Sequence, residues 1–209
     1  MRKWFLVAAG ALLIAPGGLW LITSAQAPVG AALKPAAQFT NDQLMRPENY
    51  REWIFVGCPV TPNDMNNGHA AFPEFHDVYI DRTAYEEYAR TGTFPEGTVF
   101  VKELVSVGAK QAASGKGYFP GKIGGIAAAV KDSKRFGGDR NGWGYFNFGE
   151  AKTASVMGAA DCNACHKQNA AEDMVFTQYY PVLGAAKAEP KAMPPEKTEK
   201  GTTSKGYTY

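Results

Sequence analysis

The segment Cys162-Asn163-Ala164-Cys165-His166 constrains this chain more than any other feature of its sequence. Two cysteines three residues apart lie on one side of a helical turn, where both thiols can add to the two vinyl groups of one haem. The histidine that follows can place its imidazole on the haem iron. A redox Cys-x-x-Cys pair and half of a zinc site are the alternatives, but a zinc site needs a second ligand pair at a suitable spacing. The sequence therefore predicts one covalent haem c, held by Cys162 and Cys165, with His166 as the iron ligand.

The group on the opposite face of the iron decides what such a protein does. An electron carrier fills this position with methionine or a second histidine, whereas an enzyme or a gas-binding protein leaves it open. The sequence offers five candidates for it, which are Met65, Met157, Met174, His69 and His76. Two of them, Met157 and Met174, lie so near the haem motif that packing on the histidine side is the expected role. A simple electron carrier stays an open alternative.

The first residues have the form of an export signal. Arg2 and Lys3 precede an apolar run over 4–22, and Ala25-Gln26-Ala27 offers the small-x-small pattern that signal peptidase recognises. An uncleaved membrane anchor is the alternative, although Pro16-Gly17-Gly18 interrupts the run. Both interpretations deliver the rest of the chain outside the cytoplasm. We therefore expect a signal peptide over 1–27 and a periplasmic or otherwise exported protein.

The last residues, 187–209, are rich in Lys, Glu, Pro, Thr and Gly and almost free of large aliphatic side chains. Such a stretch buries too little apolar surface to offset its ordering entropy, so we expect a disordered tail. A single haem domain is then predicted over 28–186. The leader and the tail each contribute +2, and the whole chain has a formal net charge of +2, so the core is near −2. No basic stripe marks a nucleic-acid surface, and nucleic acid is not an expected partner.

The core alternates between strand-like and helical patterns. Strands are predicted at 76–80, 98–107 and 143–148, where β-branched and aromatic residues dominate. Helices are predicted at 47–53, between a cap at Asp81 and a stop at Gly92, around the haem motif and near 176–183, whereas 123–131 fits either element. The sum is an α+β fold, mainly an antiparallel β-sheet with packed helices. A four-helix cytochrome bundle is the competitor, and the strand-like stretches argue against it.

The third cysteine, Cys58, follows the apolar stretch Ile54-Phe55-Val56-Gly57. With Cys162 and Cys165 taken up by haem, it has no partner for a disulfide. A lone cysteine in an oxidising compartment is either a buried small hydrophobic residue or a reactive thiol. The apolar neighbours favour burial.

Several ordered blocks of the core carry a family resemblance. They are Tyr50-Arg51-Glu52-Trp53-Ile54-Phe55-Val56-Gly57, Gly97-Thr98-Val99-Phe100-Val101-Lys102-Glu103-Leu104, Val130-Lys131-Asp132-Ser133-Lys134-Arg135-Phe136, Trp143-Gly144-Tyr145-Phe146-Asn147-Phe148 and, after the haem motif, Glu172-Asp173-Met174-Val175-Phe176. In these blocks the chain resembles the cytochrome P-460 family. The resemblance implies a mostly antiparallel β fold, usually a homodimer, and a five-coordinate haem c with an open distal side. Similar family members oxidise hydroxylamine, whereas the related c′-beta cytochromes bind nitric oxide.

The resemblance also assigns a role to Lys102. In the enzymes of this family a lysine is covalently bonded to the haem ring, and Lys102 matches it by position. In a strand, Lys102 shares a face with Phe100 and Leu104, while Glu103 shares the other with Val101 and Val105. Alternation alone does not say which charge points inward. A lysine paired or extended to solvent at a strand edge is the alternative.

One departure from the family bears on catalysis. Hydroxylamine-oxidising members place a carboxylate in the distal pocket, and our alignment puts Lys122 at that position. A protonated lysine is a poor base. The neighbouring Ile123, Ile126 and 127–129 predict a dry, apolar pocket, which suits nitric oxide better than proton-coupled oxidation. Three residues elsewhere could supply the missing carboxylate, namely Glu103, Asp132 and Asp139.

Three hypotheses follow from the sequence. The first is an oxidoreductase that oxidises hydroxylamine and passes the electrons to an exported redox partner. The second is a nitric oxide binding cytochrome without turnover. The third is an electron carrier with a six-coordinate haem.

Overall fold

The computed structural model of the protein describes residues 35–188. The predicted signal peptide over 1–27 lies outside the described residues, and so does the predicted tail beyond Ala188. Within 35–188, no helix has both the length and the apolar character that a membrane span requires.

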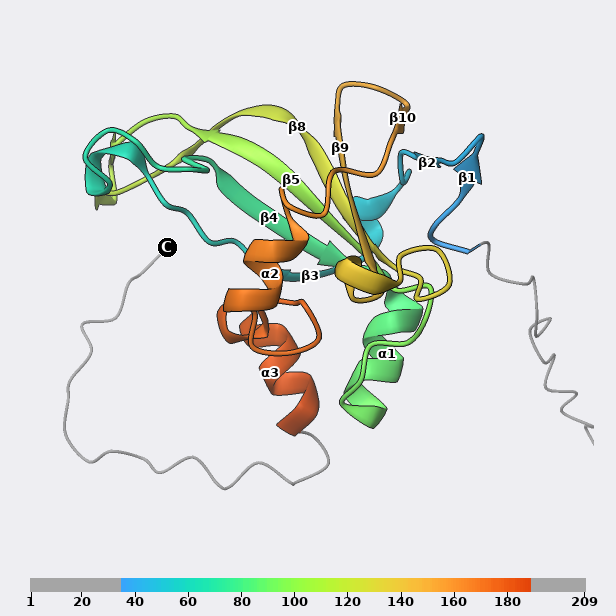
Figure 1. Ribbon diagram of the computed structural model, residues 1–209. Coiled ribbons are helices and arrows are strands. Elements are labelled where there is room, and N and C mark those ends of the chain that lie inside the picture. The colour runs from blue at the N-terminus through green and yellow to red at the C-terminus, as the bar shows by residue number, and fades with distance from the viewer. Residues whose placement is uncertain (1–34, 189–209) are drawn as a thin grey trace, which may run out of the picture. The chain divides into compact units, whose positions relative to one another are not determined.

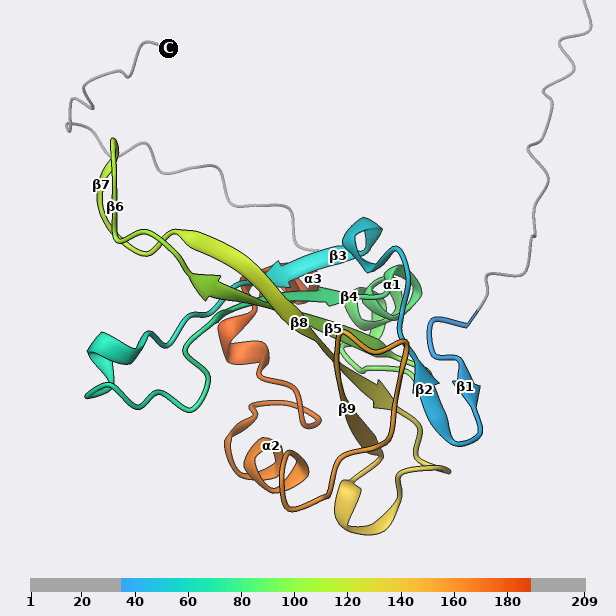
Figure 2. The ribbon, with the colours of Figure 1, turned by 90° about the horizontal axis from the view of Figure 1, so that it is seen from above.

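One antiparallel sheet of five strands organises the domain, with the order β3-β4-β5-β8-β9. Its strands are β3 (Ile54–Gly57), β4 (Phe75–Ile80), β5 (Val99–Val107), β8 (Pro120–Lys131) and β9 (Trp143–Gly149). A smaller sheet has the order β1-β2-β10 and is formed by β1 (Phe39–Thr40), β2 (Gln43–Met45) and β10 (Thr153–Ala154). A hairpin of β6 (Gln111–Ala112) and β7 (Gly115–Lys116) projects from the main sheet, as Figure 2 shows.

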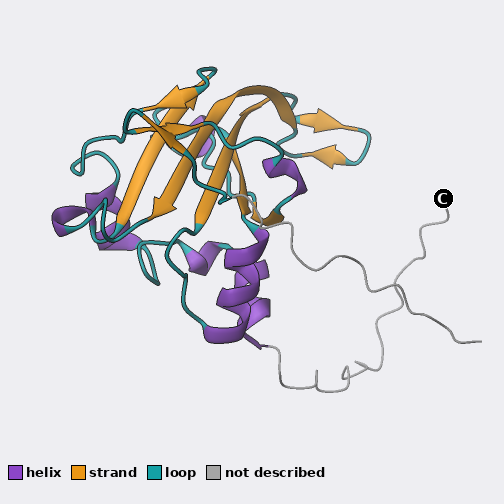
Figure 3. Cartoon of the chain, turned by 90° about the vertical axis from the view of Figure 1, so that its right-hand side faces the viewer, coloured by secondary structure: helices purple, strands orange, loops and turns teal. Residues whose placement is uncertain are grey.

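Three α-helices accompany the sheet, namely α1 (Arg82–Thr91), α2 (Asn163–Asn169) and α3 (Pro181–Ala188). They gather on one side of the sheet (Figure 1), and Figure 3 shows the same segregation of helices and strands. Four 3₁₀ turns complete the described part, at Tyr50–Glu52, Asn63–Met65, Gly138–Arg140 and Thr177–Tyr179. The predicted α+β class with an antiparallel sheet is confirmed, and the helical bundle is excluded.

Two apolar clusters fill the two faces of the main sheet. On the helix side, Val78, Phe100 and Trp143 pack against α1 and α3 through Tyr88 and Leu183. On the opposite side, a second cluster of apolar residues packs under β1 and β2, and it includes Leu44, Tyr50, Val99, Val101, Ile126 and Phe146. Because side chains alternate along β5, the helix side receives Lys102 and the opposite side receives Glu103. Alternation alone did not decide which of the two charges lies on the helix side, and the structure shows that it is Lys102.

Local sequence patterns explain most of the elements. The strand expected at 98–107 is β5, and the aromatic strand at 143–148 is β9. The ambiguous segment 123–131 is strand β8, which lies between these two strands and hydrogen-bonds to both. The helix expected at 47–53 is wrong, because only the 3₁₀ turn Tyr50–Glu52 forms. Asn49 adopts a left-handed backbone with φ of 57°, which no continuous α-helix accommodates.

Helix α1 begins and ends as its sequence predicts, and its cap joins it to the sheet. The Asp81 carboxylate accepts hydrogen bonds from the Ala84 N–H at 2.9 Å and from the Val99 N–H at 2.8 Å. The first is the usual N-cap bond, and the second fixes the start of β5. Gly92 closes the helix in the left-handed conformation, with φ of 73°. One carboxylate thus sets the position of both α1 and β5.

Replacing Asp81 by alanine should lower the free energy of unfolding by about 3 kcal/mol, because two buried N–H groups then lose their acceptor. Urea unfolding followed by circular dichroism measures the loss. Asp81→Asn is the matched control, since its amide oxygen can still accept one bond, and we expect it to lose less than half as much. Equal stability of the alanine variant and the parent protein would contradict this account of the cap.

Candidate haem site

The haem motif lies at the start of α2, and a buried asparagine holds that helix to the sheet. The Asn163 amide donates hydrogen bonds to the Arg140 and Trp143 carbonyl oxygens, both at 2.8 Å. Cys162 is half-buried against the helix-side cluster, whereas Cys165 is exposed, and both thiols are free. Because these residues flank a single helical turn, their sulfurs are presented on one side of α2.

The imidazole of His166 is fixed by a backbone carbonyl and two aromatic rings. Its Nδ1 lies 2.6 Å from the Met174 carbonyl oxygen. A carbonyl can only accept, so Nδ1 must carry the hydrogen and Nε2 must keep its lone pair. The rings of Tyr145 and Phe176 lie 4.4 Å and 4.6 Å from the imidazole ring, centroid to centroid. This is the tautomer that an iron-binding histidine requires, and the hydrogen bond to the carbonyl fixes the orientation of the ring.

The electrostatics of His166 agree with this role. Burial is the main cause that lowers its pKa, and the Lys102 ammonium lowers it further, although the bond to Met174 opposes the shift. A lowered pKa keeps the ring neutral, which is the form that binds a metal. The donor set of Cys162, Cys165 and His166 therefore fits a covalent haem. No cluster of three or more histidine, cysteine or acidic side chains suited to a bare metal ion occurs in the described part of the chain.

An unusual turn delivers the Met174 carbonyl to His166. Asp173 and Met174 both have positive φ, of 42° and 64°, which is rare outside glycine and asparagine. The Asp173 carboxylate holds the turn through Lys131 Nζ at 2.6 Å and Trp143 Nε1 at 3.3 Å. The Tyr145 hydroxyl donates a second hydrogen bond to the same Met174 carbonyl at 3.3 Å. Met174 thus binds Nδ1 of His166 with its backbone carbonyl and not with its sulfur.

Lys102 extends from β5 toward the same side of the sheet as the haem motif. Its Nζ lies 4.8 Å from the centre of the Phe72 ring. Burial lowers the pKa of its ammonium. The electrostatic attraction of Cys162 and Glu74 partly opposes that shift. In the strand next to it, the small residue Ala127 stands in register with Lys102. The structure therefore places Lys102 on the same side of the sheet as the motif and near Cys162.

Lys122 is not brought together with these residues. It is exposed on β8, and its backbone N–H donates to the Ser106 hydroxyl at 2.9 Å. The apolar lining predicted around it is also different, because Ile123 is 57% exposed and Ile126 packs on the opposite face of the sheet. The predicted distal role of Lys122 gains no support from its position.

The three carboxylates named as substitutes lie elsewhere. Glu103 is buried on the opposite face, where the Tyr50 hydroxyl donates to it at 2.9 Å and Arg51 forms an ion pair with it. Burial and the Glu103 carboxylate raise the pKa of Tyr50 to about 12. Asp132 caps a turn after β8 through the Arg135 N–H at 3.0 Å, and Asp139 is exposed in the 3₁₀ turn Gly138–Arg140.

Sequence reasoning missed Glu74, an acidic residue near Lys102 on the haem side of the sheet. Glu74 precedes β4, is half-buried, and is close enough to Lys102 to raise the pKa of its ammonium. Its signal in the sequence is the alternation of Glu74, His76 and Val78, which places the three side chains on one face of an extended segment.

Among the candidates for the sixth ligand, Met65 and His69 are exposed, and the Met157 sulfur lies 3.7 Å from the Cys162 sulfur.

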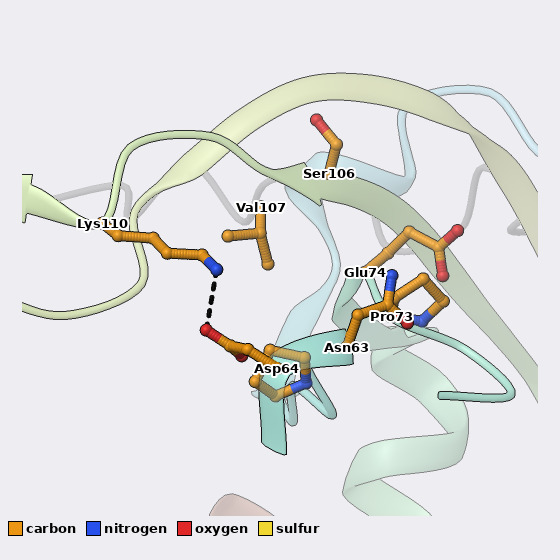
Figure 4. Close-up of a pocket in the computed structure, with 8 residues that line it drawn as sticks. Asn63, Asp64, Pro73, Glu74, Ser106, Val107 and Lys110 are labelled. Atoms are coloured by element: carbon orange, nitrogen blue, oxygen red, sulfur yellow. Dashed lines mark hydrogen bonds and ion pairs between the residues drawn. The ribbon is translucent and has the colours of Figure 1, made fainter. Parts of the chain in front are cut away.

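A cleft of about 340 Å³ adjoins this region, between the segment that precedes β4 and the end of β5. Glu74 and Ser106 line it, and the Lys110–Asp64 ion pair, at 2.7 Å, closes one side (Figure 4). None of the haem-motif residues lines this cleft. It is therefore a surface feature beside the haem site, with Glu74 common to both.

Cys58 departs from the prediction, because the residue is exposed rather than buried. Desolvation of its sulfur and the Asp77 carboxylate nevertheless raise the pKa of the thiol to about 12. A thiol with so high a pKa is protonated at neutral pH and is a poor nucleophile. Cys58 belongs neither to the haem motif nor to the core.

A helix-borne Cys-x-x-Cys-His segment, with its histidine tied to a carbonyl and packed beneath an antiparallel sheet, defines a haem-binding cytochrome. The Cytochrome P-460 family model matches residues 47–177, and the chain belongs to that family. The match covers β3 to β9 and the whole of α2. A search of curated proteins returned no match.

Proposed function

We propose that this chain is an exported haem c cytochrome that oxidises hydroxylamine at the open face of its haem. Cys162 and Cys165 would form the thioether bonds, and Nε2 of His166 would bind the iron. The observation that carries the proposal is the 2.6 Å bond from His166 Nδ1 to the Met174 carbonyl, which leaves Nε2 as the coordinating nitrogen. The free thiols one turn away support the covalent attachment.

Lys102 would bond to the haem ring in an oxidative step: an N–C bond replaces an N–H bond of the amine and a C–H bond of the ring, and an external oxidant such as a peroxide takes up the electrons. The half-buried position of this lysine, its lowered pKa and its proximity to Cys162 support this, because a neutral amine is the nucleophilic form of lysine. Covalent bonding would also remove a charge that burial penalises. The ring of Phe72, over the lysine amine, offers an apolar surface of the kind that a haem covers.

Each residue of the site has a task in this proposal. Haem iron, when bound, supplies a binding position for the substrate nitrogen and takes up its electrons. The Met174 carbonyl holds the Nδ1–H of His166, which keeps the imidazole oriented and increases its donor strength. Glu74 is a half-buried carboxylate on this side of the sheet, and it would take a proton from the substrate.

The remaining parts of the proposal concern location and partners. The predicted leader supports export, and thioether attachment of haem is normally completed outside the cytoplasm. Electrons from hydroxylamine would leave to an exported redox partner. We also propose a homodimer, which the resemblance to the family supports.

The absorption spectrum of the reduced protein, produced with a haem-attachment system, tests the proposal. A strongly red-shifted Soret band is expected, together with steady turnover of hydroxylamine with an artificial electron acceptor. An ordinary high-spin band with tight nitric oxide binding and no turnover would instead identify a gas-binding cytochrome. Sharp low-spin bands would reject the open distal face and indicate an electron carrier.

A further inference from the structure

The side chain of His76 contains an unpaired buried nitrogen. Its Nε2 is inaccessible to solvent and has no hydrogen-bond partner within residues 35–188. Buried polar atoms in proteins nearly always have a partner, and an unpaired one costs about 1–3 kcal/mol. An atom of this kind on the haem side of the sheet indicates a partner that is not part of the polypeptide. The other orphaned atom, Asn163 Oδ1, belongs to the amide that anchors α2.

His76 belongs to the same group of side chains as Lys102. In the β4–β5 ladder, Lys102 stands opposite Val78 and His76 stands opposite Leu104, so His76 and Lys102 are diagonal neighbours on one face. The Phe72 ring contacts both, at 5.9 Å from the His76 ring and 4.8 Å from Lys102 Nζ. Phe72, His76 and Lys102 thus form one group of neighbouring side chains on the haem side of the sheet.

Burial, together with one neighbouring charge, keeps the His76 ring neutral. Burial, followed by the Lys102 ammonium, lowers the pKa of His76 to about 4. Glu74, two residues earlier on the same face, is the neighbouring carboxylate. A neutral imidazole has one nitrogen that donates and one that accepts. When Nδ1 carries the hydrogen, Nε2 is a free acceptor on a side chain that shares its face of the sheet with Lys102.

We propose that Nε2 of His76 accepts a hydrogen bond from a protic nitrogen ligand of the haem, and so favours hydroxylamine over nitric oxide. Hydroxylamine has O–H and N–H groups to donate, whereas nitric oxide has no hydrogen. A ligand that donates to this buried acceptor gains a hydrogen bond, whereas a ligand without hydrogen leaves the acceptor as it was and gains nothing from it. This role rests on the proposed function, because it requires an open distal face that both ligands can reach.

Spectral titration of the ferric holoprotein with hydroxylamine, without an electron acceptor, tests the proposal, and nitric oxide is titrated in parallel. His76→Leu should weaken hydroxylamine binding about tenfold, the equivalent of one hydrogen bond, and leave nitric oxide affinity within about twofold. His76→Gln offers an amide oxygen as acceptor and should restore part of the loss. His69→Leu is the matched control, since His69 is exposed in the segment before β4.

Unchanged hydroxylamine affinity in His76→Leu, or an equal loss for both ligands, would overturn the role of His76 while the open face stands. A low-spin spectrum of the parent protein that becomes high-spin in His76→Leu would also overturn it, because His76 would then be an iron ligand. Failure of the parent protein to bind either ligand would overturn the proposed function itself. That outcome is distinguishable because it appears without any substitution.

Discussion

Replacing Cys162 and Cys165 together by serine should abolish covalent haem, and no haem-stained band should remain on a denaturing gel. The two sulfurs flank one turn of α2 and are free to bond, and a hydroxyl group does not form a thioether in their place. Each single serine variant should keep one thioether bond and retain part of the stain. The absorbance of the extracted haem, measured against protein concentration, gives the stoichiometry.

Cys58→Ser is the matched control for this experiment. Cys58 is also a free cysteine, but the pKa of its thiol is raised to about 12, and it lies outside the haem motif. We expect its haem content and spectrum to equal those of the parent protein. A covalent haem in the double variant, or its loss in Cys58→Ser, would contradict the assignment of the thioether bonds.

The strands of the main sheet were largely predictable because their signals are local. β5 is dense in β-branched residues and β9 in aromatic ones, and both preferences reflect packing on a half-buried pleated surface. β8 was ambiguous because alanine and glycine have no strong preference for either element. Its position between β5 and β9 is decided by the pairing of distant segments, which no local window contains.

The orientation of β5 shows where local reasoning ends. Lys102 and Glu103 are adjacent charges on two apolar faces, so alternation fits both orientations. Tyr50 and Arg51, some fifty positions earlier in the chain, bind Glu103 on the face away from α2. That contact leaves Lys102 on the haem side. Tyr50 and Arg51 also belong to the 3₁₀ turn that replaces the helix expected at 47–53. Their contact with Glu103 therefore explains both the missing helix and the orientation of β5.

The haem motif was predictable in its ligands but not in the contacts that support them. Cys162, Cys165 and His166 are recognised by spacing alone. The partner of His166 is the backbone carbonyl of Met174. Every residue has a backbone carbonyl, so no residue type in the sequence could indicate this partner. The sequence predicted packing on the histidine side for Met174, and the hydrogen bond that its peptide oxygen accepts from His166 could not be read from the sequence. Glu74 was missed because it lies just before a strand, where the alternating pattern is short.

Replacing Lys102 by methionine should remove the red-shifted Soret band and lower hydroxylamine turnover by more than about tenfold, a barrier change of at least 1.4 kcal/mol. Methionine has a similar length and no charge, so it suits a position where burial lowers the pKa of the lysine. The fold should therefore persist, and unfolding in urea should show no loss of stability. A spectral change in a protein of unchanged stability would come from the chemistry of the amine.

Lys122→Met is the matched control, because Lys122 is exposed on β8 and shares no contact with Lys102 or His166. We expect its spectrum and turnover to match the parent protein. Mass spectrometry of tryptic peptides supplies the direct test, since a bonded Lys102 is not a trypsin site and its peptide should carry the haem. An unmodified Lys102 peptide in full yield would exclude the bond. The cysteines and His166 would then hold an ordinary haem c, and the nitric oxide binding alternative would gain the stronger support.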